Sequence, residues 1–87
     1  MLKTIQLIRP NEVMKRRSVG HSKLYDEIAK GLWPPFIKIG RASIEPEHEV
    51  NVMLAAIVAG ATDDERRQLV QQLVAQRKSL AHPASAA

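Results

Sequence analysis

The chain contains no cysteine, which excludes disulfides, thiolate metal sites and cysteine nucleophiles. It is also poor in aromatic residues, with one Trp, one Tyr and one Phe. Its longest apolar run, VMLAAIVAGA at residues 52–61, is about half as long as a membrane-spanning helix. The N-terminal MLKTIQLIRP lacks the apolar centre and cleavage site of a signal peptide. We therefore expect a cytoplasmic protein that does not contact a membrane.

The charge of the chain is unevenly distributed. Its 87 residues, enough for one small domain, carry a net charge of +4. Residues 1–44 hold nine Lys/Arg and three Asp/Glu, residues 45–65 hold six acids and no base, and residues 66–87 hold four bases and no acid. A concentrated basic region is typical of proteins that bind polyanions. The alternative is an ordinary solvated surface on which the charges cluster by chance.

The front of the chain predicts a short strand or extended arm followed by two helices. TIQLI, residues 4–8, alternates weakly in hydropathy. Pro10 suits the first position of a helix that ends at Arg17. After a tight connector at residues 18–20, we expect a second helix from about His21 to Lys30. The apolar stripe of that helix comprises Leu24, Tyr25, Ile28 and Ala29. Its polar face comprises Ser22, Lys23, Asp26, Glu27 and Lys30.

Residues 31–35, GLWPP, interrupt the helical pattern. Gly31 suits the position just after a helix C-terminus, and the two prolines impose a rigid, extended path. We call residues 31–35 the elbow. The next nine residues, FIKIGRASI at 36–44, alternate on either side of Gly40 and predict a hairpin of two short strands.

Two further helices are expected in the second half of the chain. Pro46 opens a helix that ends at Gly60, and Thr62 caps a fourth helix over about 62–80 through a capping box with Glu65. The stripe of the third helix comprises Val50, Met53, Leu54, Ile57 and Val58. The stripe of the fourth comprises Leu69, Val70, Leu73, Val74 and Leu80. Residues 81–87 are small and terminal, and we expect a disordered tail.

The order of helix, tight turn, helix, hairpin and helix is that of a winged helix-turn-helix. We therefore predict a mainly α fold with a small β-hairpin, forming one such domain over residues 1–80 with helices at its C-terminal end. In this arrangement helix 21–30 fits a major groove, and hairpin 36–44, the wing, touches an adjacent groove or its phosphates. The elbow would hold helix and wing on a common side.

Three segments also resemble a known family: LIRPNEV at 7–13, SVGHSKLYDEIAKGLWPPFIKIGRAS at 18–43 and PEHEV at 46–50. They are similar to the AlpA family of small phage- and island-encoded DNA-binding proteins, over about residues 5–78. The resemblance implies a winged helix-turn-helix related to MerR-type and excisionase folds. It also implies a regulator of integrase or excisionase genes, or a recombination directionality factor that bends attachment-site DNA. The chain departs from the family pattern at Asp26 and at Ile44–Glu45.

Ten residues are predicted DNA contacts. They are His21, Ser22, Lys23, Tyr25 and Asp26 on the second helix, Lys38 and Arg41 on the wing, and Lys15, Arg16 and Arg17 at the end of the first helix. The first turn of the reading helix usually reaches base edges, whereas wing cations meet phosphates or the minor groove. Asp26 could accept a hydrogen bond from a cytosine amino group.

Several of these residues have an alternative interpretation. Ser22 could simply cap its helix, and Lys38 could serve solubility. Compensation of the helix dipole would also explain the three bases at 15–17. For Tyr25 we favour core packing, with its hydroxyl reaching a phosphate.

The fourth helix has two interpretations. It either closes the core or presents Leu69, Leu73 and Leu80 to an integrase or to another copy of the chain along DNA, where multivalency would raise affinity. The competing functional hypothesis is a protein-interaction module, an adaptor or antitoxin, that uses the acidic stretch 45–65 and helix 62–80. No glycine loop suits a phosphate, and the isolated histidines 21, 48 and 82 form no zinc motif. We expect neither an enzyme nor a cofactor.

Overall fold

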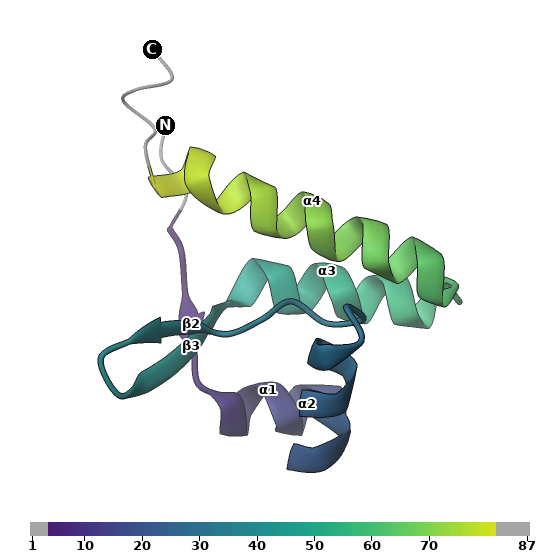
Figure 1. Cartoon of the computed structure of the whole chain (residues 1–87), viewed down its shortest axis with the longest axis horizontal. Coiled ribbons are helices and arrows are strands. Elements are labelled where there is room, and N and C mark those ends of the chain that lie inside the picture. Colours follow the sequence, from purple (N-terminus) through teal and green to yellow (C-terminus); the bar gives the residue numbers. More distant parts are fainter. Residues whose placement is uncertain (1–3, 82–87) are drawn as a thin grey trace.

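The computed structural model describes residues 4–81, so the expected tail lies outside the described residues from 82 onward. The elements are β1 (Leu7–Ile8), α1 (Pro10–Arg17), α2 (His21–Ala29), β2 (Ile37–Ile39), β3 (Ala42–Pro46), α3 (Glu47–Val58) and α4 (Asp63–Ala81). Figure 1 shows α3 and α4 side by side and antiparallel, with α1 and α2 across α3 from α4. The β2–β3 hairpin projects from one end of the molecule (Figure 1). The prediction of a mostly helical chain with a small hairpin is confirmed at this level.

The ends of the helices lie close to where local sequence signals predict them. Pro10 is the first residue of α1. Gly31, at φ 76°, follows the C-terminus of α2, and the N–H of Leu32 donates to the carbonyl of Glu27 at 2.8 Å. This pairing, with the N–H of Gly31 on Ile28, closes the helix as a Schellman motif. Thr62 and Glu65 form the predicted capping box, with reciprocal bonds of 2.8 and 3.1 Å.

The sheet contains three antiparallel strands in the order β1-β3-β2. Ile39 pairs with Ala42, which leaves a two-residue turn at Gly40 and Arg41, and Gly40 has the positive φ expected there. The strand interpretation of the N-terminal segment is confirmed for Leu7–Ile8, which pair with the end of β3. The hairpin is therefore anchored by a third strand beside the start of α3.

The core draws side chains from every helix and from the elbow. It comprises Val13, Leu24, Trp33, Val50, Met53, Val70 and Leu73. Trp33 is fully buried, so the elbow inserts its largest side chain into the core as well as redirecting the chain. Burial of an aromatic ring of this size is a major part of the hydrophobic stabilisation of so small a domain.

Two predicted stripes differ from the structure. On α2 the buried residues are Leu24 and Glu27, whereas Tyr25 is 37% exposed and Ala29 is also exposed. The buried stripe is rotated toward Glu27 because two arginines neutralise that carboxylate. On α3 the last residue, Val58, is 88% exposed, since it lies at the turn into α4 and beyond the packed part of the helix.

Arginines of α4 hold the elbow from outside. Arg67 donates to the carbonyl of Lys30 at 2.9 Å, Arg66 to Leu32 at 3.1 Å, and Arg77 to Pro35 at 2.9 Å. These carbonyls lie between the end of α2 and the start of β2, where neither element supplies a backbone N–H donor for them. The direction of the hairpin relative to α2 therefore depends on α4 as well as on the prolines.

Two glutamates are fully buried beneath the sheet and α3. Glu49 accepts from Arg77 Nε at 2.8 Å, which balances its charge. Glu45 accepts from Trp33 Nε1 at 2.7 Å through one oxygen, and its other oxygen has no partner among the described residues. Loss of hydration raises the pKa of Glu45 from 4.5 to about 8. The hydrogen bond from Trp33 and the charge of Arg77 oppose this shift, whereas the charge of Glu49 adds to it. The carboxyl group is therefore protonated at neutral pH.

This burial predicts a pH-dependent stability that Glu45→Gln removes. Between about pH 4.5 and 8 the unfolded chain loses the Glu45 proton while the folded chain keeps it, so the free energy of unfolding falls as pH rises. Glutamine keeps an oxygen for Trp33 but does not titrate. The stability of the variant relative to the parent should rise by a few kcal/mol from pH 5 to 8, at about 1.4 kcal/mol per pKa unit.

Urea unfolding at each pH, followed by the fluorescence of the single Trp33, measures this difference. Parallel pH profiles for the two proteins would show that Glu45 titrates normally.

Candidate nucleic-acid interface

The exposed surface of α2 carries the predicted contacts of this helix. His21, Ser22, Lys23, Tyr25 and Asp26 are all exposed. The N-cap position belongs to Gly20, and no side chain caps the helix, so the capping interpretation of Ser22 is wrong. The Ser22 hydroxyl is thus available on the surface, in the first turn of the helix.

A row of aromatic rings joins α2 to the hairpin. The rings of His21 and Tyr25 stack with centroids 4.3 Å apart and planes inclined by 29°. Tyr25 also contacts Phe36, which precedes β2, at 5.7 Å and 39°. Core packing of Tyr25 is therefore wrong: the ring lies on the surface, where it contacts both neighbours. Such pairs contribute about 0.5–1.5 kcal/mol each and favour the stacked orientation of the His21 ring.

The two flanks of α2 differ in character. Because residues four apart share a side of a helix, His21 and Tyr25 lie on the flank that meets Phe36. Lys23 lies on the opposite flank, above Glu27. Asp26, between the flanks, pairs with Lys30 at 3.0 Å. The acid that departs from the family pattern is thus offset by a cation one turn away.

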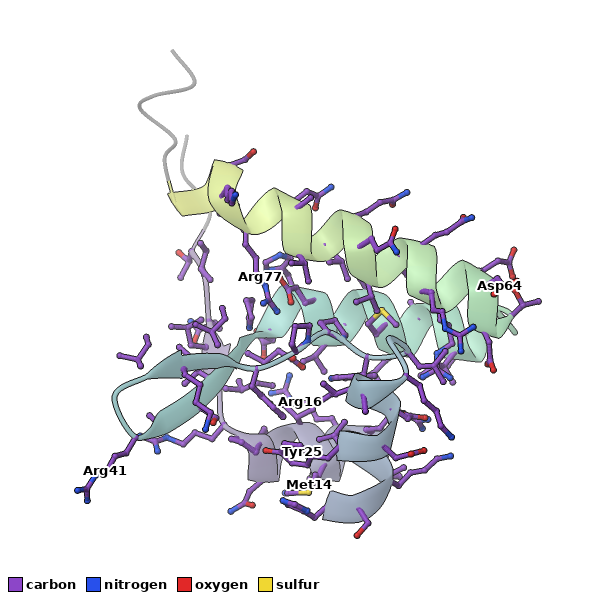
Figure 2. All side chains as sticks on the ribbon, viewed as in Figure 1. Met14, Arg16, Tyr25, Arg41, Asp64 and Arg77 are labelled. Carbon is purple, nitrogen blue, oxygen red and sulfur yellow. The ribbon has the colours of Figure 1, made fainter. Side chains whose placement is uncertain are left out.

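The hairpin presents two cations. Arg41 occupies its turn and Lys38 the middle of β2, and both are exposed without an ion pair among residues 4–81. Figure 2 shows Arg41 projecting from the tip of the hairpin, away from the rest of the molecule. Both side chains can therefore approach a polyanion without first breaking an internal contact.

The bases at the end of α1 divide into two kinds. Arg16 donates to Glu12 and to Glu47, each at 2.8 Å, and Arg17 donates to Glu27 at 2.7 Å. These guanidinium groups tie α1 to α3 and α2, so the prediction that both contact phosphates is not supported. Lys15 is exposed and unpaired within the described chain.

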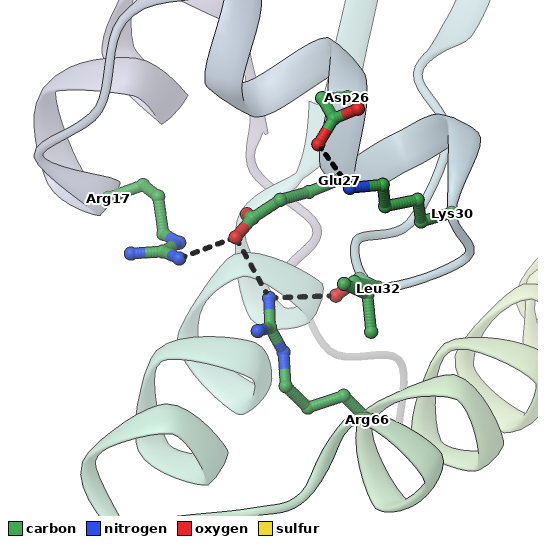
Figure 3. Close-up of polar contacts among 6 residues, drawn as sticks. All are labelled: Arg17, Asp26, Glu27, Lys30, Leu32 and Arg66. Carbon is green, nitrogen blue, oxygen red and sulfur yellow. Dashed lines mark hydrogen bonds and ion pairs between the residues drawn. The ribbon is translucent and has the colours of Figure 1, made fainter.

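Glu27 joins three helices through two arginines. Its side chain is 3% exposed and accepts from Arg17 of α1 at 2.7 Å, while Arg66 of α4 lies 3.4 Å away (Figure 3). Arg66 also donates to the elbow carbonyl of Leu32. A buried carboxylate is tolerated only with such compensation. Two guanidinium groups on one carboxylate leave the cluster with a net positive charge beneath α2.

The acidic stretch 45–65 does not form one surface. Glu45 and Glu49 are buried, and Glu47 pairs with Arg16. The exposed acids of this stretch are Asp63, Asp64 and Glu65, all in the first turn of α4. Asp64 lies at the opposite end of the molecule from Arg41 (Figure 2). The charge asymmetry along the sequence thus becomes an asymmetry across the molecule.

The predicted partner residues of α4 are mostly internal. Leu73 is 5% exposed and Leu69 packs against the core, whereas Leu80 is 40% exposed. The helix therefore closes the core, the first of its two interpretations. The structural roles of Arg66 and Arg77 were not predicted, although both continue the stripe of Val70 and Leu73 at spacings of four, three and four residues.

No family model, curated protein or solved structure matches the chain. Within residues 4–81, no helix combines the length and the apolar character needed to cross a membrane. In the same part of the chain, no three His, Asp or Glu side chains converge as metal ligands.

Glu27 and Asp26 offer a matched test of the buried cluster. Glu27→Gln leaves Arg17 and Arg66 without their counter-charge and should lower the free energy of unfolding by about 3 kcal/mol. Asp26→Asn, the same chemical change one residue away, removes only an exposed pair and should cost less than about 0.5 kcal/mol. Urea denaturation of both variants measures the contrast. Equal losses would mean that the Glu27 cluster contributes no more than a surface ion pair.

Proposed function

We propose that this chain binds double-stranded DNA as a winged helix-turn-helix, with α2 in the major groove and the β2–β3 hairpin as the wing. One observation carries the proposal. In the described part of the chain, six exposed lysines and arginines make no ion pair, and five of them precede residue 45. They are Arg9, Lys15, Lys23, Lys38 and Arg41, the sixth being Lys78. The free positive charge is thus concentrated on the elements that would meet DNA.

The proposed contacts divide into base reading and phosphate binding. His21, Ser22 and Lys23 lie in the first turn of α2, from which base edges are reached. Asp26 can accept from a cytosine amino group, and Tyr25 supports the His21 ring. Arg41, Lys38 and Lys15 serve phosphates or the minor groove. Arg16 and Arg17 have internal partners and are not included.

The resemblance to the AlpA family supports a role in a phage-like or integrative element. The protein would act as an excisionase-type directionality factor, as a transcription regulator, or as both. Phosphate contacts position it, a few base contacts select the site, and bending of the DNA brings distant sites together. An excision assay with purified integrase and attachment-site DNA distinguishes the recombination role from regulation alone.

Arg41→Ala tests the wing. Binding to mixed-sequence duplex should weaken steeply with salt, by about 0.9 log units per log unit of salt for each phosphate neutralised. Loss of Arg41 should reduce that slope by about one and weaken binding to every sequence. Lys78→Ala, which removes an exposed cation from α4, is the control and should leave the slope unchanged.

Fluorescence anisotropy over a salt series measures both variants. Equal slopes for the two would remove the wing from the interface. An absence of duplex binding at low salt would refute the proposed function.

His21→Ala and Lys23→Ala should instead change which sequences are bound. Loss of a base contact relaxes the preference at one or two positions, by about 1–3 kcal/mol per position. Selection from random duplexes followed by sequencing gives the preference of each variant. Gln71→Ala, an exposed neutral position on α4, should reproduce the parent profile. If all four proteins select the same sequences, the first turn of α2 does not read bases.

A further inference from the structure

One face of the sheet is apolar and largely uncovered. Leu7 lies opposite Pro46 and Ile37 opposite Ile44, so these side chains share a face, which alternation extends to Ile5 and Ile39. Of the seven exposed large hydrophobic residues described, three lie on this face, namely Ile39 at 60%, Leu7 at 51% and Ile5 at 43%, and a fourth, Leu80 of α4 at 40%, borders it. We call Ile5, Leu7, Ile37, Ile39 and Leu80 the apolar sheet face. Clustered exposure of this kind marks an interaction surface.

A groove of about 290 Å³ runs along this face. Its walls come from β1, from the paired ends of β2 and β3, and from the end of α4. They comprise Ile5, Leu7, Ile37, Pro46, Arg77 and Leu80. The groove thus lies beside the segment that enters β1 and is open to an incoming apolar side chain.

Beside the groove, one edge of residues 5–7 has no backbone partner among residues 4–81. β1 lies at the margin of the sheet, and the N–H of Glu47 donates to the carbonyl of Gln6 at 2.7 Å. Backbone groups alternate in direction along a strand, so the N–H and C=O groups of Ile5 and Leu7 point away from β3. An unpaired edge of this kind is a template for another strand.

The two margins of the sheet differ in how they are protected. β2 carries Lys38 at its centre and follows Pro34 and Pro35, features that block pairing at an edge. Residues 4–8, TIQLI, contain neither charge nor proline. The open margin is therefore the one formed by β1.

We propose that a second copy of this chain pairs with the edge formed by residues 5–7, where the chain enters β1, with the two segments antiparallel about a two-fold axis. When the same strand from two copies pairs in the antiparallel direction, the pair is two-fold symmetric. The same edge then supplies both sides of the contact. Hydrogen bonding through Ile5 and Leu7 places the axis at Gln6 and joins the two sheets. Ile5 of each copy then packs beside Leu7 of the other, and the two apolar sheet faces become continuous.

The charges around the face permit this pairing. Arg77, in the groove wall, is held by Glu49, and Lys38 points to the other face of the sheet. Within residues 4–8 two copies therefore meet without unpaired like charges, and Arg9 of each copy, unpaired in the described chain, lies outside the paired residues 5–7. A second copy presents the same uncharged edge with the same apolar alternation, so Ile5 and Leu7 of each copy meet an apolar partner in the other. The inference does not depend on DNA binding.

Sedimentation of the full chain without DNA tests the proposal over a micromolar to millimolar series. The parent chain should show a concentration-dependent dimer. Leu7→Lys places a charge in the contact and should weaken dimerisation by at least about tenfold. Val58→Lys makes the same kind of change at an exposed valine outside the apolar sheet face and should leave the dimer intact. Circular dichroism of each variant checks that it is folded.

A single cysteine tests the register in this cysteine-free chain. At the two-fold axis the two Gln6 residues form a non-hydrogen-bonded pair with Cα atoms about 4.5 Å apart, within disulfide range. Gln6→Cys should therefore yield a covalent dimer on mild oxidation, and Val58→Cys should not. A monomeric parent chain would overturn the proposal, even if the face captured another protein. It would also be overturned by a dimer that Leu7→Lys leaves intact, or by one that Gln6→Cys fails to link.

Discussion

The hydrogen bonds from α4 to the elbow determine how the front half of the molecule is arranged. Arg66, Arg67 and Arg77 reach carbonyls at the end of α2 and in the elbow, which neither helix nor strand satisfies. Hydrogen bonds from charged donors contribute about 1.5–3 kcal/mol when sheltered from water, and less where the arginine is exposed. Trp33 anchors the same segment from inside through its burial and its bond to Glu45. The angle between α2 and the hairpin is thus held from both sides, by a helix distant from the proposed DNA surface.

The same arginines explain where the charge of the protein is found. Burial of a carboxylate is costly unless it is paired, and Glu27 and Glu49 are each paired with an arginine from another helix. Arg16 is also paired, with Glu12 of its own helix and with Glu47 of α3, both of which are partly exposed. Three of the nine acidic residues are therefore buried in the fold, and two more are paired with Arg16. The cations that remain without partners among residues 4–81 are mainly on α1, α2 and the hairpin. The proposed interface is therefore positively charged.

The hairpin serves two proposed surfaces with different residues. Lys38 points to one face of the sheet and Arg41 lies in the turn, whereas Ile37 and Ile39 point to the other face. This alternation allows phosphate contact and self-association to use one element without competing for a side chain. The acidic first turn of α4 lies at the far end of the molecule (Figure 2), where it would not repel a bound polyanion strongly.

Sequence alone determined the element order and most element ends, because those features depend on backbone geometry within a few residues. Pro10, Gly31, Gly40 and the Thr62–Glu65 box act through local φ angles and local hydrogen bonds. Periodicity likewise identified Leu24, Val50 and Met53 as core. Tertiary structure alone decided which charged residues are structural. Arg16 and Arg77 find their carboxylates 31 and 28 residues away, and whether Glu27 or Tyr25 turns inward depends on arginines from other helices. No local pattern encodes that choice, because the energy of a buried charge is set by partners that only the folded chain brings near.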